Sequence, residues 1–512
     1  MRGVFNANRH SLEPCMLLTF IAIYLLVSIG IGLYASTRVR NTADYAVAGR
    51  SLPMAVVIAT TFATWFGSET VLGVSGQFVK EGLHGVIEDP FGAGMCLILV
   101  GLFFAYKLYQ KNLITIGDYY RLRFGRTIEV LCSGIIIFSY LGWVGAQVTA
   151  LGLVFNLLTH GAMTVTTGMV VGTLIVLVYT LFGGMWAVAM TDFVQMIVIT
   201  IGLVLIAWFA ADMAGGAGKV IEYAASERKF QLFPTSGLLK DWLFFFAAAI
   251  TMMLGSIPQQ DVFQRVMSSK NVKVATRGPV IGGMLYIVFA LVPMFVVTSA
   301  VFVMPETTLA LLGDDPQKVL PTLVLEHMPL ALQIAFFGAL LSAIMSTASA
   351  TLLAPSTSFV ENILRNLRPG MSDATTLKAM RISVFIFTLC VLVYSITMEG
   401  SSIYELVSGA YQVPLVGAFV PLVFGLYWKR ATSQGALLAI SMGIGVWLLF
   451  VASPVLSEAF PQQLAGLLAA LVGMVGGSLA PQFLPDHKDH VQRYEASAAA
   501  GGTPDVAHAT KS

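Results

Sequence analysis

The amino-acid sequence predicts an all-α polytopic membrane protein with about thirteen transmembrane helices, including two inverted repeats of five helices with one broken helix in each. Three observations lead to this prediction. Of the 512 residues, 57% are hydrophobic and only 11% are charged, whereas soluble proteins carry about 25% charged residues. Apolar runs long enough to cross a bilayer recur along the chain, and its mean hydropathy is +0.81. Two of these runs are interrupted by glycine or proline.

The predicted helices follow these runs in chain order. Residues 1–14 form a polar outer segment without the features of a cleavable signal peptide, and 15–35 form an additional helix before the repeats. Two C-terminal helices lie within 434–482, and we expect the polar, Ala- and Gly-rich segment 486–512 to be a disordered cytoplasmic tail. The predicted spans are about 15–35, 52–80, 88–106, 128–158, 164–184, 190–212, 241–258, 278–303, 331–358, 379–397, 403–427, 434–453 and 462–482.

The interruptions define the repeats. The second predicted helix reads VIATTFATWFGSETVLGVSGQF, with Gly67 near its middle, and the seventh reads FFFAAAITMMLGSIPQQDVFQRV, with Gly255 and Pro258. These helices are five apart, so 52–212 and 241–427 are predicted to be the two repeats. Broken helices at matching positions indicate a transporter with its binding site near the membrane midplane. The alternative is that glycine is simply common in membrane helices.

The distribution of charge predicts the orientation. If the N-terminus is outside, most Lys and Arg residues fall on the cytoplasmic side, and the outer loop 304–330 is more acidic than basic. This satisfies the positive-inside rule. We therefore expect a multi-pass protein, most simply of a bacterial plasma membrane, with a cytoplasmic C-terminus. The formal charge of +2 gives no indication of nucleic-acid binding, and no catalytic domain or enzymatic activity is expected.

Hydroxyl side chains are dense in the ninth predicted helix, which contains LLSAIMSTASATLLAPSTS. Ser342, Ser346 and Ser349 share one helix face, and Thr347 lies beside it. Packing can explain such a stretch, because small and hydroxyl side chains are favoured where membrane helices meet. The alternative is coordination of a small hard cation, which prefers oxygen ligands. Na⁺ would be satisfied by neutral oxygens, whereas Ca²⁺ would be expected to need carboxylates.

Two acidic residues fall within predicted helices. Asp192 opens the sixth helix and Glu69 lies in the break of the second. Ionisable groups inside membrane segments are costly and usually mark a path for ions. A boundary position for Asp192 and a non-specific polar lining for Glu69 are the structural alternatives.

Five motifs give the sequence a resemblance to the sodium:solute symporter family over nearly the whole chain. They are FATWFGSETVLGVSG, ITIGDYYRLRFG, FGGMWAVAMTDFVQM, GSIPQQDVFQRVMSSKN and GALLSAIMSTASATLLAPSTSFVENIL. The sequence is most similar to the choline transporter branch and to the sodium/proline symporters. The resemblance implies a LeuT-type fold and a Na⁺-coupled symporter that imports a small organic solute by alternating access.

The resemblance also implies sodium ligands. The positions that match the main sodium site of the family are Ala63, Phe66, Ala343, Ser346 and Thr347. Some relatives bind a second sodium ion, and the matching positions here are Asp192, Ser346 and Ser349. Because Ala350 stands where those relatives have a further hydroxyl, we expect one sodium ion per solute.

The implied solute site lies beside the first break. Trp65 and Trp143 match two positions of the aromatic cage in the choline branch, while Gln259 stands where a third tryptophan is expected. The substrate-binding residues expected here are Trp65, Gly67, Ser68, Trp143 and Gln259. The expected solute is an amino acid such as proline or a choline-like quaternary amine. A monocarboxylate or sugar symporter, a channel, and a transporter-like sensor with a separate signalling partner are the alternatives.

Overall fold

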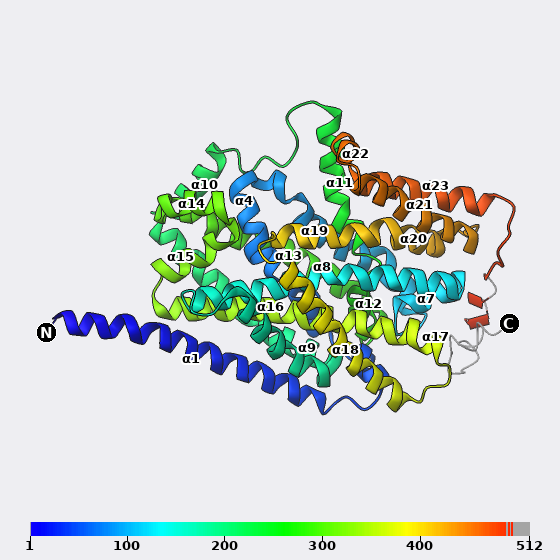
Figure 1. The fold of residues 1–512 in the computed structure, drawn as a ribbon, viewed down its shortest axis with the longest axis horizontal. Coiled ribbons are helices and arrows are strands. Elements are labelled where there is room, and N and C mark those ends of the chain that lie inside the picture. Colours follow the sequence, from blue (N-terminus) through cyan, green and yellow to red (C-terminus); the bar gives the residue numbers. More distant parts are fainter. Residues whose placement is uncertain (1, 488–489, 492, 495–512) are drawn as a thin grey trace.

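The computed structural model describes residues 2–487, 490–491 and 493–494, and these residues are almost entirely helical (Figure 1). Of the predicted disordered tail, 486–512, only residues 486–487, 490–491 and 493–494 are among the described residues, and the rest lies outside them. The described part contains no β-strand, only an isolated bridge between Leu52 and Ser269. The α-helices are α1 (Arg2–Ser36), α2 (Thr42–Val47), α3 (Met54–Trp65), α4 (Ser75–Glu81), α5 (Ala93–Leu99), α6 (Ala105–Tyr109), α7 (Ile116–Phe124), α8 (Arg126–Leu158), α9 (Val165–Met213), α10 (Ala217–Ser226), α11 (Leu239–Gly255), α12 (Gln260–Ser268), α13 (Val272–Val303), α14 (Pro305–Asp314), α15 (Val319–His327), α16 (Leu330–Ser358), α17 (Arg365–Leu367), α18 (Asp373–Thr397), α19 (Ile403–Pro414), α20 (Val420–Tyr427), α21 (Ser433–Val451), α22 (Pro454–Ala459) and α23 (Gln462–Leu479). The short 3₁₀ and π-helical segments are η1 (Ala48–Arg50), η2 (Glu69–Val74), η3 (Gly82–Val86), η4 (Ile87–Gly92), η5 (Val100–Phe104), η6 (Pro316–Lys318), η7 (Phe359–Leu364) and η8 (Leu415–Phe419).

The helices are long and apolar enough for a multi-pass membrane protein. Within the described residues, ten helical runs reach the length and hydropathy of a membrane span, or eleven if the bent pair α11 and α12 is one span. Two further apolar helices, α3 and Val165–Val178 at the start of α9, are shorter than this. Helix length therefore does not establish the number thirteen, which remains a prediction.

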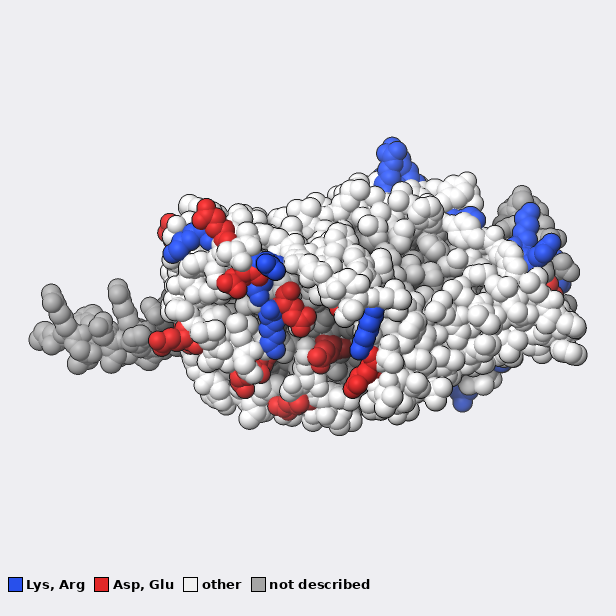
Figure 2. Space-filling view, turned by 90° about the horizontal axis from the view of Figure 1, so that it is seen from above, with Lys and Arg blue, Asp and Glu red and all other residues white. Residues whose placement is uncertain are grey.

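The surface agrees with a membrane setting. Large apolar side chains are exposed on the outer helices, for example Trp208, which is 70% exposed, and Val472, which is 62% exposed. On the face shown in Figure 2, the acidic side chains gather toward the end that carries α10, α14 and α15 in Figure 1, and much of the remaining surface is uncharged. Such a surface is stable only against lipid.

The predicted fifth and sixth helices correspond to the two parts of α9, which meet at a kink at Gly184. Gly184 has φ 51° and ψ −145°, a conformation that residues with a side chain rarely adopt. A Cβ at this position would also lie 2.5 Å from the carbonyl oxygen of Tyr45. The glycine therefore permits both the kink and the close approach of α2.

Both predicted helix breaks occur in the structure. Helix α3 ends at Trp65, Phe66 has a non-helical ψ of 69°, and helical structure resumes before η2. Helices α11 and α12 meet at a bend of 46° across residues 256–259. Each break leaves backbone groups without helical partners in the protein interior, where such groups need another partner.

Helix α16 lies at the centre of the bundle, and α1 lies along one side (Figure 1). Helix α16 is buried almost continuously from Phe336 to Ser358, and it packs against α8, α9, α3 and α18. A helix enclosed in this way presents its polar groups to other helices rather than to lipid. The dense hydroxyl stretch is therefore an interior feature.

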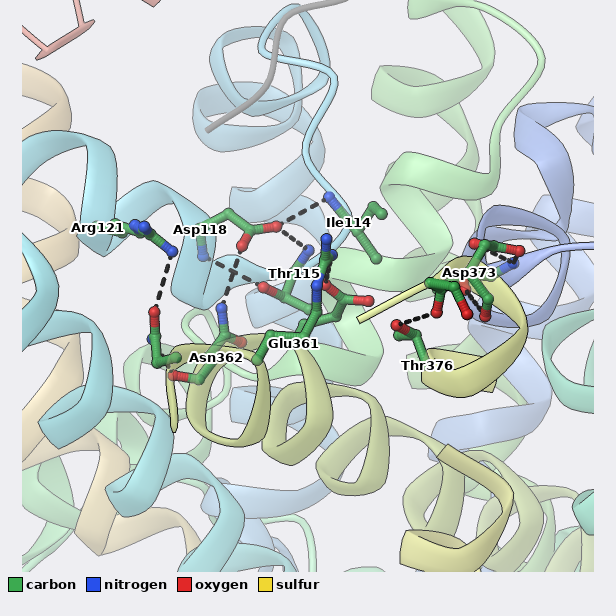
Figure 3. A network of polar contacts seen from close by, with 12 residues as sticks. Ile114, Thr115, Asp118, Arg121, Glu361, Asn362, Asp373 and Thr376 are labelled. Atoms are coloured by element: carbon green, nitrogen blue, oxygen red, sulfur yellow. Dashed lines mark hydrogen bonds and ion pairs between the residues drawn. The ribbon is translucent and has the colours of Figure 1, made fainter. Parts of the chain in front are cut away.

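A polar network joins the end of α16 to α7 and α8 (Figure 3). Asn362 in η7 donates to Asp118 at 3.1 Å and to Glu129 at 3.0 Å, and Asn366 donates to the second oxygen of Glu129 at 2.8 Å. Asp118 also accepts from the backbone N–H of Thr115 at 3.0 Å. Burial raises the pKa of the Asp118 carboxyl above its ordinary value, and this hydrogen bond opposes the shift. The network fixes one end of α16 relative to two other helices.

Candidate ion and solute site

The hydroxyls of α16 fall into two groups. Those of the first group donate to the carbonyl four residues earlier in their own helix, and they are Ser342, Thr351, Ser356 and Thr357. Ser349 likewise donates within the helix, to the carbonyl of Ser346 at 3.0 Å. Local bonding of this kind is the ordinary way to bury a hydroxyl in a membrane helix. Ser342 and Thr357 also contact other helices, through Tyr24 on α1 and Gln264 on α12. Ser346 and Thr347, the second group, differ because they donate to another helix instead of to a carbonyl of their own helix.

Thr347 faces the broken end of α3. Its hydroxyl donates to the carbonyl of Thr64 at 2.9 Å and lies 3.4 Å from the carbonyl oxygen of Ala63. The Thr64 carbonyl would ordinarily accept from the N–H of Ser68, but that N–H donates to Gln147 on α8 at 3.0 Å. The helix break therefore leaves carbonyl oxygen facing a hydroxyl, which is a donor set suited to a monovalent cation.

The other residues predicted for the main sodium site lie at the end of α3 and on the turn of α16 that precedes Thr347. Phe66 is the first residue after α3, and its non-helical ψ removes its carbonyl from the helical pattern. Ala343 is fully buried and lies one turn before Thr347 on α16. Ser346 differs, because its hydroxyl donates to Asp192 on α9 at 2.5 Å. The two adjacent residues thus donate to different partners: Thr347 to a carbonyl of α3, and Ser346 to the carboxylate of Asp192.

Asp192 is the centre of a second group of hydrogen bonds. It is fully buried and lies in the part of α9 that follows the Gly184 kink. One carboxylate oxygen accepts from Ser346 and the other from Thr60 on α3. The structure therefore brings together two of the three residues predicted for a second ion, but Ser349 bonds to its own helix instead. Thr60 was missed, although it precedes Thr64 by one helical turn.

Three aromatic rings meet beside the first break. The ring centroids of Trp65 and Trp143 are 5.6 Å apart, and Tyr411 on α19 lies 5.8 Å from Trp65 and 5.2 Å from Trp143. All three side chains are buried. Tyr411 was not predicted, and the available signal was only an aromatic residue within a predicted helix. We refer to Trp65, Trp143 and Tyr411 as the aromatic cluster.

Glu69 connects the aromatic cluster to the backbone of the break. Its carboxylate accepts from Nε1 of Trp143 at 3.1 Å and from the amide of Gln147 at 2.6 Å. The amide oxygen of Gln147 in turn accepts from the N–H of Ser68. Glu69 is only 1% exposed, so these hydrogen bonds compensate for part of the cost of burying its carboxylate. Glu69 is thus held by specific partners rather than being a loose polar lining.

Gly67 lies between Thr347, on the side of the ion site, and Glu69, which contacts the aromatic cluster. A Cβ built on it would be 2.5 Å from a carboxylate oxygen of Glu69, 2.7 Å from the hydroxyl oxygen of Thr347 and 2.9 Å from the amide oxygen of Gln147. A side chain at this position would therefore displace these three groups from their present positions. The glycine allows three oxygen-bearing groups from three helical segments to converge on the break.

Several buried polar atoms around the aromatic cluster have no hydrogen-bond partner within the described residues. Gln259 donates to Ser139 at 2.9 Å, but its amide oxygen is unpaired. The other unpaired groups are Nε1 of Trp65 and the hydroxyls of Ser68, Ser256 and Tyr411. Leaving such groups unpaired costs about 1–3 kcal/mol each. Unpaired buried polar groups beside both helix breaks are expected of a site for a polar solute.

A buried arginine, which was also missed, supports the first break. Arg265 on α12 is 1% exposed and donates from Nε to the hydroxyl of Thr64 at 3.0 Å and from Nη1 to the carbonyl of Asp261 at 2.7 Å. Asp261 also accepts from the hydroxyl of Tyr140 at 2.5 Å. The two broken helices are therefore linked through the side chain of Arg265.

The donor types favour a monovalent ion. Among the described residues, no group of three or more His, Cys, Asp or Glu side chains is placed to hold a metal. Carbonyls and hydroxyls predominate around Thr347, with a single carboxylate at Asp192. Divalent metals and Zn²⁺ are ordinarily held by several carboxylate, imidazole or thiolate groups.

Comparison with known proteins agrees with this geometry. The chain is 29% identical over 465 residues to the high-affinity proline transporter PutP of Bacillus subtilis (strain 168), a match that covers 88% of this chain and 95% of the relative. It is 27% identical over 454 residues to the high affinity choline transporter 1 of Homo sapiens, covering 84% of this chain and 75% of the relative.

The fold is that of a known solved transporter. A substrate-bound, outward-open Na⁺-coupled sialic acid symporter superposes with a TM-score of 0.78 at 20% identity, covering 92% of this chain and 98% of the other. This likeness supports a LeuT-type fold. The model of the sodium:solute symporter family matches residues 45–443, which include both helix breaks and α16. The chain belongs to the sodium:solute symporter family, a family of transporters rather than enzymes, and Na⁺ is its coupling ion.

Proposed function

We propose that this protein imports a small organic solute that carries a positively charged nitrogen, in symport with Na⁺. The observation that carries the proposal is the aromatic cluster, whose Trp143 is hydrogen-bonded to the buried carboxylate of Glu69 at 3.1 Å. Aromatic ring faces attract cations, and the attraction is stronger where water is excluded. A nearby carboxylate supplies the opposite charge that a buried ammonium group needs.

Two solute classes fit this description. A choline-like quaternary amine would use the ring faces of the aromatic cluster. An amino acid such as proline would also bring a carboxylate, for which the unpaired groups of Trp65, Ser68, Ser256 and Tyr411 offer hydrogen-bond donors. The relatives named for choline and for proline transport support both classes, and a competition experiment separates them.

We assign the coupling ion to the space between α3 and α16. Its ligands are the carbonyls of Ala63, Phe66 and Ala343 and the hydroxyls of Ser346 and Thr347. This assignment requires Ser346 to turn from Asp192 toward the carbonyls when the ion binds. Asp192 with Ser346 and Thr60 is a candidate for a second ion, and one ion per solute is the proposed stoichiometry because Ser349 bonds within its own helix.

Transport proceeds by alternating access. In the proposed topology the chain has thirteen spans, repeats 52–212 and 241–427, an outer N-terminus and a cytoplasmic C-terminus, and it most simply belongs to a bacterial plasma membrane. Binding of Na⁺ orders the break of α3 beside the solute, and rocking of one helical bundle against the other opens the inner side. Inward movement of one net charge releases about 2.3 kcal/mol per 100 mV.

Uptake into proteoliposomes tests the function. Radiolabelled choline and proline are supplied with an inward Na⁺ gradient or with an equal K⁺ gradient, and each unlabelled compound competes with the other. Saturable, Na⁺-dependent uptake of one of them supports the proposal, and Trp143→Ala and Glu69→Gln should each reduce it strongly. Uptake only of a sugar or of a monocarboxylate would overturn the cationic-solute assignment. Binding without flux would favour the sensor, and flux that does not saturate would favour a channel.

A further inference from the structure

A groove lies on the outside of the bundle between α1, the start of α3 and α9. Its volume is about 750 Å³, within the range of roughly 300–1,000 Å³ that is usual for ligand sites. Helix α1 precedes the part of the chain matched by the family model, residues 45–443. None of the residues that line the groove belongs to the ion and solute site, and one wall of the groove comes from a helix outside the region matched by the family model.

The walls of the groove are apolar. From α1 the lining side chains recur at helical spacing on one face, and they are Val27, Gly30, Ile31 and Tyr34. From α9 a second helical face contributes Trp186, Ala189, Met190, Phe193 and Val194. Leu52, Pro53 and Val56 form the floor. Val27 is 54% exposed and Phe193 is 36% exposed, so the groove is open toward the side where the bilayer lies.

One end of the groove is positively charged. Arg38 follows the apolar run Met16–Ser36 by two residues, which places it at the level of the lipid headgroups. Its guanidinium lies 5.0 Å from the ring centre of Trp186, and it makes no salt bridge within the described part of the chain. The guanidinium of Arg381 lies 5.9 Å from the ring centre of Phe182, but this pair lies on the other side of the Gly184 kink and does not line the groove. Arg38 therefore supplies the positive charge at this end of the apolar groove.

We propose that this groove binds an anionic phospholipid of the surrounding bilayer. One acyl chain lies between α1, α3 and α9, and the phosphate accepts hydrogen bonds from Arg38. The planar guanidinium is well suited to phosphate oxygens. Tyr34 and Trp186 lie at the same end, and such amphipathic rings are favoured at the membrane interface. A lipid held here would fix α1 against α9, the helix that carries Asp192.

Gly30 gives the proposal a sharp test. A Cβ on Gly30 would meet nothing within 4 Å, so Gly30→Leu fills the groove without disturbing the helices. Gly445 on α21 has equally open surroundings and lies outside the groove, so Gly445→Leu is the matched control. Arg38→Gln removes the charge at the mouth and leaves the apolar walls intact.

Native mass spectrometry of the delipidated full chain measures binding of dioleoylphosphatidylglycerol and of dioleoylphosphatidylcholine. We expect the tightest adduct to form with the anionic lipid, and Arg38→Gln to weaken it about tenfold, as for loss of one charged hydrogen bond. Gly30→Leu should abolish this adduct, and Gly445→Leu should leave it unchanged. Equal binding of the two lipids by the native chain would overturn the proposal, as would an unchanged adduct in correctly folded Gly30→Leu protein.

Discussion

Removal of the Thr347 hydroxyl is the most direct perturbation of the proposed ion site. This hydroxyl bonds to the carbonyl of Thr64 at 2.9 Å and faces that of Ala63 at 3.4 Å. Thr347→Ala removes one oxygen and one methyl-sized volume while the helix backbone remains. If Na⁺ binds there, the variant loses one of its ligands, and the Na⁺ requirement for uptake must rise.

The size of the rise follows from the contact that is lost. A polar contact to a charged group contributes about 1.5–3 kcal/mol, and each 1.4 kcal/mol or so corresponds to a tenfold change in affinity. The Na⁺ concentration for half-maximal uptake should therefore increase roughly 10- to 100-fold. It is measured by initial rates of solute uptake into proteoliposomes at constant ionic strength.

Two control variants separate ion binding from folding. Thr347→Ser keeps the hydroxyl and should retain most of the affinity for Na⁺. Thr351→Ala, one turn further along α16, removes a hydroxyl that donates to the carbonyl of Thr347 at 2.7 Å, within its own helix, and should leave the Na⁺ dependence unchanged. An unchanged Na⁺ dependence in folded Thr347→Ala protein would refute the placement of the ion between α3 and α16.

Gly67→Ala should abolish uptake in protein that still inserts in the membrane, because the new Cβ would lie 2.5 Å from the Glu69 carboxylate; normal uptake by this variant would show that the break can expand. Asp192→Asn should lower the Na⁺ requirement, because the proposed ion site needs Ser346 to leave this carboxylate, while Ser349→Ala should leave the requirement unchanged; equal effects in the same uptake assay would contradict the assigned difference. Glu129→Gln should lower the midpoint of thermal unfolding in detergent. The carboxylate of Glu129 accepts hydrogen bonds from the side-chain amides of Asn362 and Asn366, and the glutamine can accept only one of them, which costs about 1–3 kcal/mol. An unchanged midpoint would mean that the network at the end of α16 adds no stability.

Much of the fold could be predicted because membrane helices are constrained by length and hydropathy alone. Glycine and proline identified the two interruptions, at Gly67 and around Pro258, since these residues are the usual places where a helix can open in a protein interior. The predicted fifth helix likewise ends at residue 184, where the non-helical backbone of Gly184 separates the two parts of α9.

The candidate site could be predicted only in part. Ser346, Thr347, Asp192, Trp65 and Trp143 stood out because polar or aromatic groups in an apolar helix need an explanation. Tyr411, Thr60 and Arg265 were missed. Their contacts join segments far apart in the chain, and no spacing within one helix reveals which helices meet. Hydrogen bonding, rather than burial, distinguishes Thr347 from the other hydroxyls of α16, because the structure shows which carbonyl each one reaches.

The break of α3 explains how ion and solute binding can be coupled without a long pathway. Thr347, from the ion side, and Glu69, from the solute side, both approach the space above Gly67 within 3 Å of one point. Gln147 bonds to Glu69 through its amide nitrogen and accepts from the N–H of Ser68 through its amide oxygen. A shift of the backbone at the break would therefore move Gln147 and Glu69, and with them Trp143 of the aromatic cluster. An ion that draws the α3 carbonyls toward α16 would therefore also set the positions of Trp65 and Glu69. Coupling in this arrangement is a property of one short backbone segment shared by two sites, and each ligand favours the conformation that the other requires.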